Sequence, residues 1–157
     1  MLIGVVSDIH RQTWIVERVM EVLGNIDVLI HLGDNIQDVK EIKKFFKGKI
    51  LNVKGNCDYS NSIPSDIIEN IDGHRFLITH GHNYDVKYSL TRLKEKALKE
   101  KADIVLYGHT HISKIIYEEG IWFINPGSPV LARDGKNSVA LIEIKNYSIN
   151  PSIKSIR

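Results

Sequence analysis

Five short apolar runs recur along the chain, and each is followed at once by Asp, Asn or His residues. The runs occupy residues 2–6, 28–32, 50–53, 76–78 and 104–106. Runs of this length and composition are typical of strands that are buried on both faces of a sheet. In an open α/β sheet the carboxyl ends of such strands lie side by side and form the ligand-binding crevice. The pattern therefore predicts one polar site that is assembled from five loops.

Segments with helical periodicity follow several of these runs. Apolar residues recur at intervals of three and four positions in 14–23, 39–46 and 89–100, as expected for helices that bury one face. Thr13 and Asp38 precede two of these segments and are candidate N-terminal caps. Strands that alternate with helices are typical of the α/β class.

The last third of the chain has a different pattern, which is mostly that of strands. Strand-like segments occupy 113–117, 121–124, 138–144 and 149–156. Earlier in the chain, the Asp72-Gly73 pair between 67–71 and 75–79 indicates a tight hairpin turn. We therefore expect an α/β core with a second, largely antiparallel sheet packed on it.

The composition is that of one globular domain, residues 1–157, because 43% of the residues are hydrophobic and 25% are charged. The 21 basic and 19 acidic side chains nearly balance, which gives no reason to expect a nucleic-acid or membrane partner. Cys57 is the one cysteine, so no intrachain disulfide forms. No apolar run approaches the ~20 residues of a membrane span, and the N-terminal run is too short for a signal peptide. We expect a cytoplasmic location.

The side chains at the five strand ends are suited to binding transition metals. The candidate ligands are Asp8, His10, Asp34, Asn56, His80, His109 and His111. Carboxylate, amide and imidazole donors suit Mn²⁺, Fe²⁺, Zn²⁺, Ni²⁺ or Co²⁺. Such a set is too large for one ion that keeps an open position. It is the right size for two ions if one carboxylate bridges them.

These clusters, taken in order, resemble the motifs of the calcineurin-like metallophosphoesterases. The matching stretches are Asp8-Ile9-His10, Gly33-Asp34-Asn35, Gly55-Asn56-Cys57-Asp58, His80-Gly81 and Gly108-His109-Thr110-His111. The resemblance covers most of the chain. The Asn-Cys-Asp variant, the short length and the turn at 125–128 look most like the small bacterial and archaeal phosphodiesterase branch. We predict a four-layer α/β/β/α sandwich with two facing mixed sheets.

The resemblance implies a dinuclear metal centre. One ion would be held by Asp8, His10, Asp34 and His111, and the second by Asp34, Asn56, His80 and His109. Two cations ~3.5–4 Å apart activate a bridging water for in-line attack on phosphorus and hold the phosphate oxygens. We predict hydrolysis of a small phosphodiester, with Asp34, Asn56 and His109 in catalytic roles. Mn²⁺ or Ni²⁺ are the metals expected first, with Zn²⁺, Fe²⁺ and Co²⁺ as alternatives.

Cys57 departs from the pattern of the wider family, in which many members carry a histidine after the Gly-Asn pair. That histidine is associated with leaving-group protonation or transition-state stabilisation. A thiol is a poorer general acid for an alkoxide and carries no positive charge. The cysteine therefore favours a diester, or an ester with a good leaving group, as the substrate. Asp58 is expected to orient a neighbouring ligand.

Other polar and aromatic residues have less specific signals. We assign His31 and His74 to structural roles, and we expect Trp14 and Trp122 in the core. His82, Arg11 and Lys54 remain open between contact with the site and ordinary surface or structural roles. The turn at 125–129 is expected to lie near the site.

Two other functions remain open at this point. One is a phosphomonoesterase, or a nucleotide or cyclic-nucleotide hydrolase, that uses the same residues. The other is a non-catalytic scaffold that binds proteins, like the retromer-subunit relatives of the family. Those relatives have lost ligands, whereas this chain keeps every ligand position, which favours the hydrolase. The oligomeric state stays open between monomer and homodimer.

Overall fold

The computed structural model describes residues 1–157 and contains two five-stranded sheets. The first sheet consists of β1 (Leu2–Val6), β2 (Val28–His31), β3 (Lys49–Asn52), β9 (Ser138–Lys145) and β10 (Ser148–Ser155). Its strand order is β10-β9-β1-β2-β3. Strands β1, β2 and β3 are parallel, and β9 and β10 continue the sheet in antiparallel pairing.

The second sheet also combines parallel and antiparallel strands. It consists of β4 (Asp66–Ile71), β5 (His74–Thr79), β6 (Ile104–Leu106), β7 (Ser113–Glu118) and β8 (Ile121–Pro126). In the order β4-β5-β6-β8-β7, the three central strands are parallel and the two edge strands are antiparallel. The hairpin predicted around Asp72-Gly73 joins β4 to β5.

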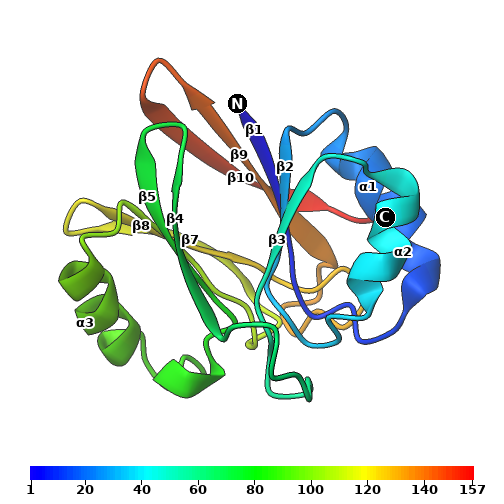
Figure 1. Cartoon of the computed structure of the whole chain (residues 1–157), viewed down its shortest axis with the longest axis horizontal. Coiled ribbons are helices and arrows are strands. Elements are labelled where there is room, and N and C mark those ends of the chain that lie inside the picture. The colour runs from blue at the N-terminus through cyan, green and yellow to red at the C-terminus, as the bar shows by residue number, and fades with distance from the viewer.

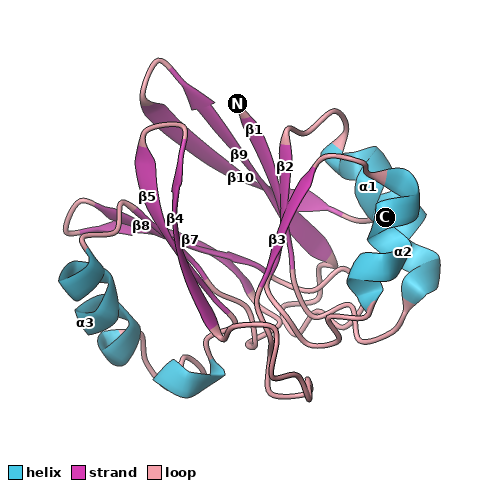
Figure 2. Ribbon diagram, in the orientation of Figure 1, coloured by secondary structure: helices cyan, strands magenta, loops and turns pink.

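Helices cover the outer faces of both sheets. Helices α1 (Val16–Leu23) and α2 (Asp38–Phe45) lie on the first sheet, and α3 (Thr91–Glu100) lies on the second (Figure 1). The two sheets face each other between these helical layers (Figure 2). The predicted four-layer α/β/β/α sandwich is therefore confirmed. No helix combines the length and the apolarity needed to cross a lipid bilayer.

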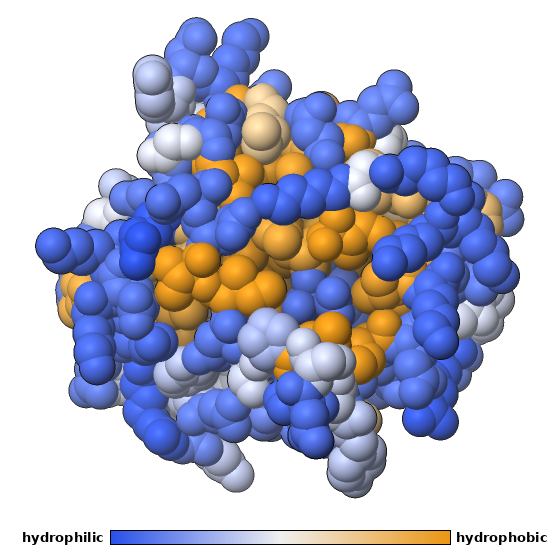
Figure 3. All heavy atoms as spheres, in the orientation of Figure 1, coloured by the Kyte–Doolittle hydropathy of each residue, from blue (hydrophilic) through white to orange (hydrophobic).

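Alternate residues of the central strands pack into different cores. Ile3 and Val5 of β1 belong to the cluster between the sheets, whereas Val6 belongs to the cluster under the helices of the first sheet. In β5, Phe76 faces the inter-sheet core and Leu77 faces the core under α3. Burial on both faces explains why these runs are continuously apolar rather than alternating. Hydrophobic atoms are visible between the two sheets, within a largely hydrophilic rim (Figure 3).

The expected partition of the strands was wrong. The C-terminal strands do not form a separate antiparallel sheet, because β9 and β10 extend the first sheet and β7 and β8 extend the second. The five motif-bearing strands are also divided between the sheets, with β1, β2 and β3 in one and β5 and β6 in the other. Periodicity identifies a strand, but strand partners depend on contacts that are distant in the sequence.

The helix starts also differ from the predictions. A 3₁₀ turn, Thr13–Ile15, precedes α1, and Thr13 does not cap that helix. Asp38 is the first residue of α2, and its carboxylate accepts a hydrogen bond from the Arg11 backbone N–H at 3.1 Å. A tertiary contact has replaced the local cap. A second 3₁₀ turn, His82–Tyr84, lies between β5 and α3.

Candidate metal centre

Five of the seven predicted ligands, in the loops after β1, β2 and β6, have an uncommon backbone conformation. Asp8, His10, Asp34, His109 and His111 all have φ between 52° and 66°. This left-handed region costs roughly 1–2 kcal/mol for each residue with a side chain. Such strain persists where the surrounding structure imposes it, and it concentrates at functional sites. The loops thus hold their polar side chains in orientations that regular extended backbone would not provide.

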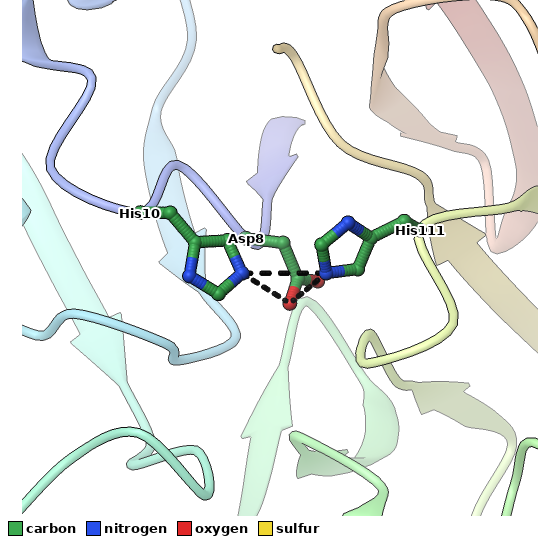
Figure 4. Close-up of side chains that lie close together, drawn as sticks. All are labelled: Asp8, His10 and His111. Atoms are coloured by element: carbon green, nitrogen blue, oxygen red, sulfur yellow. Dashed lines mark hydrogen bonds and ion pairs between the residues drawn. The ribbon is translucent and has the colours of Figure 1, made fainter. Parts of the chain in front are cut away.

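The first group of donors is Asp8, His10 and His111. Figure 4 shows the two imidazole rings approaching the Asp8 carboxylate from opposite sides, one from the loop after β1 and one from the loop after β6. Asp8 Oδ1 lies 3.2 Å from His111 Nε2 and 3.7 Å from His10 Nε2. This oxygen is buried and accepts no hydrogen bond. An unpaired buried carboxylate oxygen between two imidazoles fits a metal ion.

The second group of donors is Asp34, His80 and His109. His80 Nε2 lies 3.4 Å from Asp34 Oδ1 and 3.2 Å from His109 Nδ1. The ligand atoms of these three residues all lie within 4.8 Å of one another. His80 is fully buried, and Asp34 is 3% exposed. Both the compact spacing and the mixture of carboxylate and imidazole suit a second divalent cation.

Asp34 lies between the two groups. Its Oδ1 faces His80, and its Oδ2 lies 3.6 Å from His10 Nε2 in the first group. One carboxylate oxygen is therefore directed toward each group. The Cys57 backbone N–H donates to Oδ1 at 3.0 Å and fixes the orientation of the carboxylate.

Backbone carbonyls orient two of the histidines. His80 Nδ1 donates to Leu32 O at 2.8 Å, and His111 Nδ1 donates to Leu131 O at 2.9 Å. Because Nδ1 carries the proton in both rings, Nε2 of the neutral ring has a free lone pair directed at the carboxylates. Hydrogen bonds of this kind fix the tautomer and the orientation of a metal-binding histidine.

Polar residues outside the ligand set hold the loops together. The Asp58 carboxylate accepts hydrogen bonds from the backbone N–H groups of Asn35, Ile36 and Gly55, each at 2.9 Å. The carboxylate therefore orders the backbones of two loops. We expected it to orient a neighbouring ligand, but it makes no hydrogen bond to a ligand side chain. A side chain at Gly55 would overlap the Asp34 carboxylate, which explains the glycine of that motif.

The turn at 125–129 lies beside these loops. Asn125 is fully buried, and its Nδ2 donates to Gly108 O and to Thr110 Oγ1, both at 3.0 Å. Ser128 Oγ donates to the carbonyl of Asp8 at 2.8 Å. The turn thus links the loop after β8 to the loops after β6 and β1, which carry ligands of both groups.

Asn56 and Cys57 lie in the loop after β3. Asn56 is exposed, and its amide Nδ2 contacts Cys57 Sγ at 3.5 Å instead of hydrogen-bonding another predicted ligand. Cys57 Sγ instead falls within 4.8 Å of donor atoms of His10 and Asp34. The family motif predicts Asn56 as a ligand and assigns no such role to Cys57. Only the structure shows that the Cys57 thiol lies close to the first group.

The remaining candidates divide between the site and the periphery. The His82 ring centroid lies 5.4 Å from that of His80, so this residue borders the second group. Arg11 Nε donates to Asn35 Oδ1 at 2.9 Å, next to His10. Lys54 Nζ donates to Ser60 O at 2.8 Å, in the loop beyond β3.

Three other predictions concern residues outside the site. His31 is fully buried, and its Nδ1 accepts a hydrogen bond from the Gly33 N–H, which agrees with a structural role. Trp122 packs against the inter-sheet core. Trp14 is 70% exposed, so its assignment to the core was wrong. It lies in the 3₁₀ turn before α1, where the helical periodicity has not yet begun.

The carboxylates and histidines of the site shift one another's pKa values. Burial disfavours ionised Asp8, but contacts with His10 and His111 outweigh it, so the pKa of this carboxyl lies well below its usual range. Burial of Asp34 is likewise outweighed, chiefly by His80, and its pKa falls to about 2. Burial and the His80 charge lower the pKa of His109 to about 4. Near neutral pH the two carboxylates are ionised and His109 is neutral, as metal ligation requires. Burial of His80 is outweighed by its contacts with Asp34 and Asp8, which raise its pKa, and the hydrogen bond to Asp8 raises the pKa of His111, so a metal ion would compete with protons for these two rings.

Comparison with known proteins gives a consistent result. Residues 1–147 match the family model of the calcineurin-like phosphoesterase superfamily domain. A probable metallophosphoesterase of Methanocaldococcus jannaschii is 36% identical over 154 residues, which cover 93% of this chain and 77% of that protein. A phosphodiesterase of the same archaeon is 31% identical over 146 residues, which cover 81% of this chain and 83% of that protein. A solved Streptococcus pneumoniae structure, described as a predicted phosphoesterase, has a TM-score of 0.80 at 30% identity and covers 97% of this chain and 87% of its own.

The chain belongs to the calcineurin-like phosphoesterase superfamily. The resemblance inferred from the five motifs is confirmed, and the class is that of hydrolases acting on phosphoric esters. Divalent metal ions are implied by the family, and the two donor groups described above fit them.

Proposed function

We propose that this protein is a metal-dependent phosphodiesterase that hydrolyses a small phosphodiester. The observation that carries the proposal is the position of Asp34, whose two carboxylate oxygens face different groups of imidazole donors. A carboxylate in this position is suited to bridging two cations. A phosphodiesterase among the relatives supports the choice of diester.

Each predicted ligand has a defined part in this proposal. Asp8, His10 and His111 would hold one ion, His80, His109 and Asn56 would hold the other, and Asp34 would be shared. The chemistry that two divalent ions supply at such a centre is the activation of a water molecule for in-line attack on phosphorus and the neutralisation of phosphate charge. Asn56 would contribute its amide oxygen to the second group.

The thiol of Cys57 supports a diester over an alkyl monoester. Burial and the negative charge of Asp34 raise the pKa of the Cys57 thiol, so it is neutral near pH 7. It places no positive charge near the leaving group and is a weak proton donor there. Hydrolysis then depends on a leaving group that departs with little protonation.

Substrate comparison tests the proposal directly. Metal-stripped protein is reloaded with Mn²⁺, Ni²⁺ or Zn²⁺, and kcat/KM is measured on bis(4-nitrophenyl) phosphate and on 4-nitrophenyl phosphate. The expected result is metal-dependent hydrolysis with the diester preferred. A clear preference for the monoester would contradict the proposal and favour a phosphomonoesterase. Reloaded protein that hydrolyses neither ester would favour a non-catalytic scaffold.

A further inference from the structure

A cavity of about 410 Å³ adjoins the candidate metal centre. Thr110, which lies between the predicted ligands His109 and His111, forms part of its wall. The volume is within the range of small-molecule sites, roughly 300–1,000 Å³. A phosphodiester whose phosphorus lies at the metal centre can therefore extend one substituent into this cavity.

Three positive side chains line the cavity without partners. Lys87 precedes α3, Lys114 belongs to β7, and Arg133 lies in the loop between β8 and β9. None of the three forms an ion pair, and no acidic residue lines the cavity. Other surface lysines of this protein do pair with glutamates, as Lys49 does with Glu69 and Lys96 with Glu100. Uncompensated cations from three separate segments produce a local positive potential that attracts an anionic group.

Apolar and aromatic residues form half of the wall. Five of the ten lining residues are hydrophobic. Among them, Tyr88 is 90% exposed and presents its ring to solvent, and Tyr107 is 2% exposed.

We propose that this cavity binds one substituent of the phosphodiester, and that the substituent is a nucleoside phosphate, with a planar apolar ring and a second phosphate. The three cations account for the second phosphate and the aromatic wall accounts for the ring. The inference deepens the proposed phosphodiesterase function and rests on it.

Two substrates that differ only by one phosphate provide the test. Both are 4-nitrophenyl esters of thymidine 5′-phosphate, and one of them also carries a 3′-phosphate. With Mn²⁺-loaded protein, kcat/KM is expected to be higher for the 3′-phosphorylated ester. This preference should fall as salt is added, because exposed cations are screened.

Charge-removing variants locate the effect. Lys114→Gln and Arg133→Gln are each expected to reduce the preference ratio by roughly three- to tenfold, as for one charged contact at a partly exposed site. Lys145→Gln is the matched control, because Lys145 ends β9 on the side where β9 pairs with the start of β1, away from the metal-binding loops. It should leave the ratio unchanged.

A binding measurement separates this inference from the proposed function. Hydrolysis of the ester without the 3′-phosphate shows that the diesterase activity is present. If neither ester is hydrolysed, titration calorimetry with thymidine 3′,5′-bisphosphate still tests the cavity, and weaker binding by Lys114→Gln and Arg133→Gln than by Lys145→Gln would support it. Equal binding by all three variants, or equal kcat/KM for the two esters, would overturn the inference.

Discussion

Asp34 is the residue that connects the two donor groups. Its Oδ1 lies 3.4 Å from His80 Nε2 and its Oδ2 lies 3.6 Å from His10 Nε2. The neighbouring Cys57 contributes its backbone N–H to Asp34 and its thiol to the surroundings of His10. Two single substitutions at these positions test the centre at the scale of individual side chains.

We expect Asp34→Ala to lose both metal ions together and to lose nearly all activity, a decrease of roughly a thousandfold or more, since every effect of a metal pair on the reaction is removed. Metal content per chain, measured after dialysis, checks this. Asp8→Ala is the matched comparison, because Asp8 belongs to the first group alone, and it should mainly weaken one site. Two well-bound ions in Asp34→Ala would show that the bridging assignment is wrong.

Cys57→His is expected to raise monoester hydrolysis relative to diester hydrolysis by roughly tenfold or more. An imidazole can donate a proton and carry a positive charge near neutral pH, whereas the Cys57 thiol is neutral there. The ratio of kcat/KM on 4-nitrophenyl phosphate to that on bis(4-nitrophenyl) phosphate measures the change. Cys57→Ser serves as a control for loss of the thiol alone. An unchanged ratio in the histidine variant would mean that leaving-group protonation does not limit the reaction.

At the scale of elements, the centre depends on how the loops after the strands are tied together. Strands β1 and β2 deliver Asp8 and Asp34, and β5 and β6 deliver the histidines of the second sheet. The turn after β8 connects these loops through Asn125 and Ser128. Because these hydrogen bonds are buried, their loss should lower the stability of the protein and displace the ligands.

Removal of the Asn125 side chain tests that connection. In Asn125→Ala the Gly108 carbonyl and the Gly127 N–H lose a buried partner, and the free energy of unfolding should fall by roughly 1–3 kcal/mol. Urea unfolding of the metal-free protein measures this. Asn61→Ala, at an exposed loop position, should change stability by less than about 0.5 kcal/mol. Equal midpoints for the two variants would contradict the role given to the turn.

At the scale of the whole molecule, the two sheets each supply part of the centre. Asp8, His10 and Asp34 follow strands of the first sheet, and His80, His109 and His111 follow strands of the second. The inter-sheet core, which includes Ile30, Phe76 and Ile104, sets the distance between them. Metal binding should therefore stabilise the packing of the sheets, because only the folded arrangement brings the donors together.

The stability of the protein with and without metal ions tests this expectation. Mn²⁺ at about a hundred times its dissociation constant should raise the free energy of unfolding by about 2.7 kcal/mol, which appears as a higher melting temperature. A chelator should reverse the shift, and Asp34→Ala should show little of it. Melting temperatures of wild-type protein that are identical with and without Mn²⁺ would contradict a centre shared by the two sheets.

Much of this protein could be predicted from short-range patterns. Buried strands are recognisable from continuous apolar runs, and the Asp72-Gly73 turn is recognisable from two residues, because both are local properties. The helix starts were less predictable. Thr13 lies in a 3₁₀ turn, and the Asp38 carboxylate contacts the backbone of Arg11. Such contacts join segments that are distant in the sequence, and they override local capping preferences.

The sequence by itself determined the set of strands, the donors that follow them and the family to which the motifs belong. Residue types after apolar runs carry that information directly. Only the tertiary structure decided that the donor-bearing strands are divided between two sheets, that the Cys57 thiol lies within 4.8 Å of donor atoms of His10 and Asp34, and that Lys87, Lys114 and Arg133 share one cavity. These are distances between segments far apart along the chain, and they are set by the packing of the two sheets against each other.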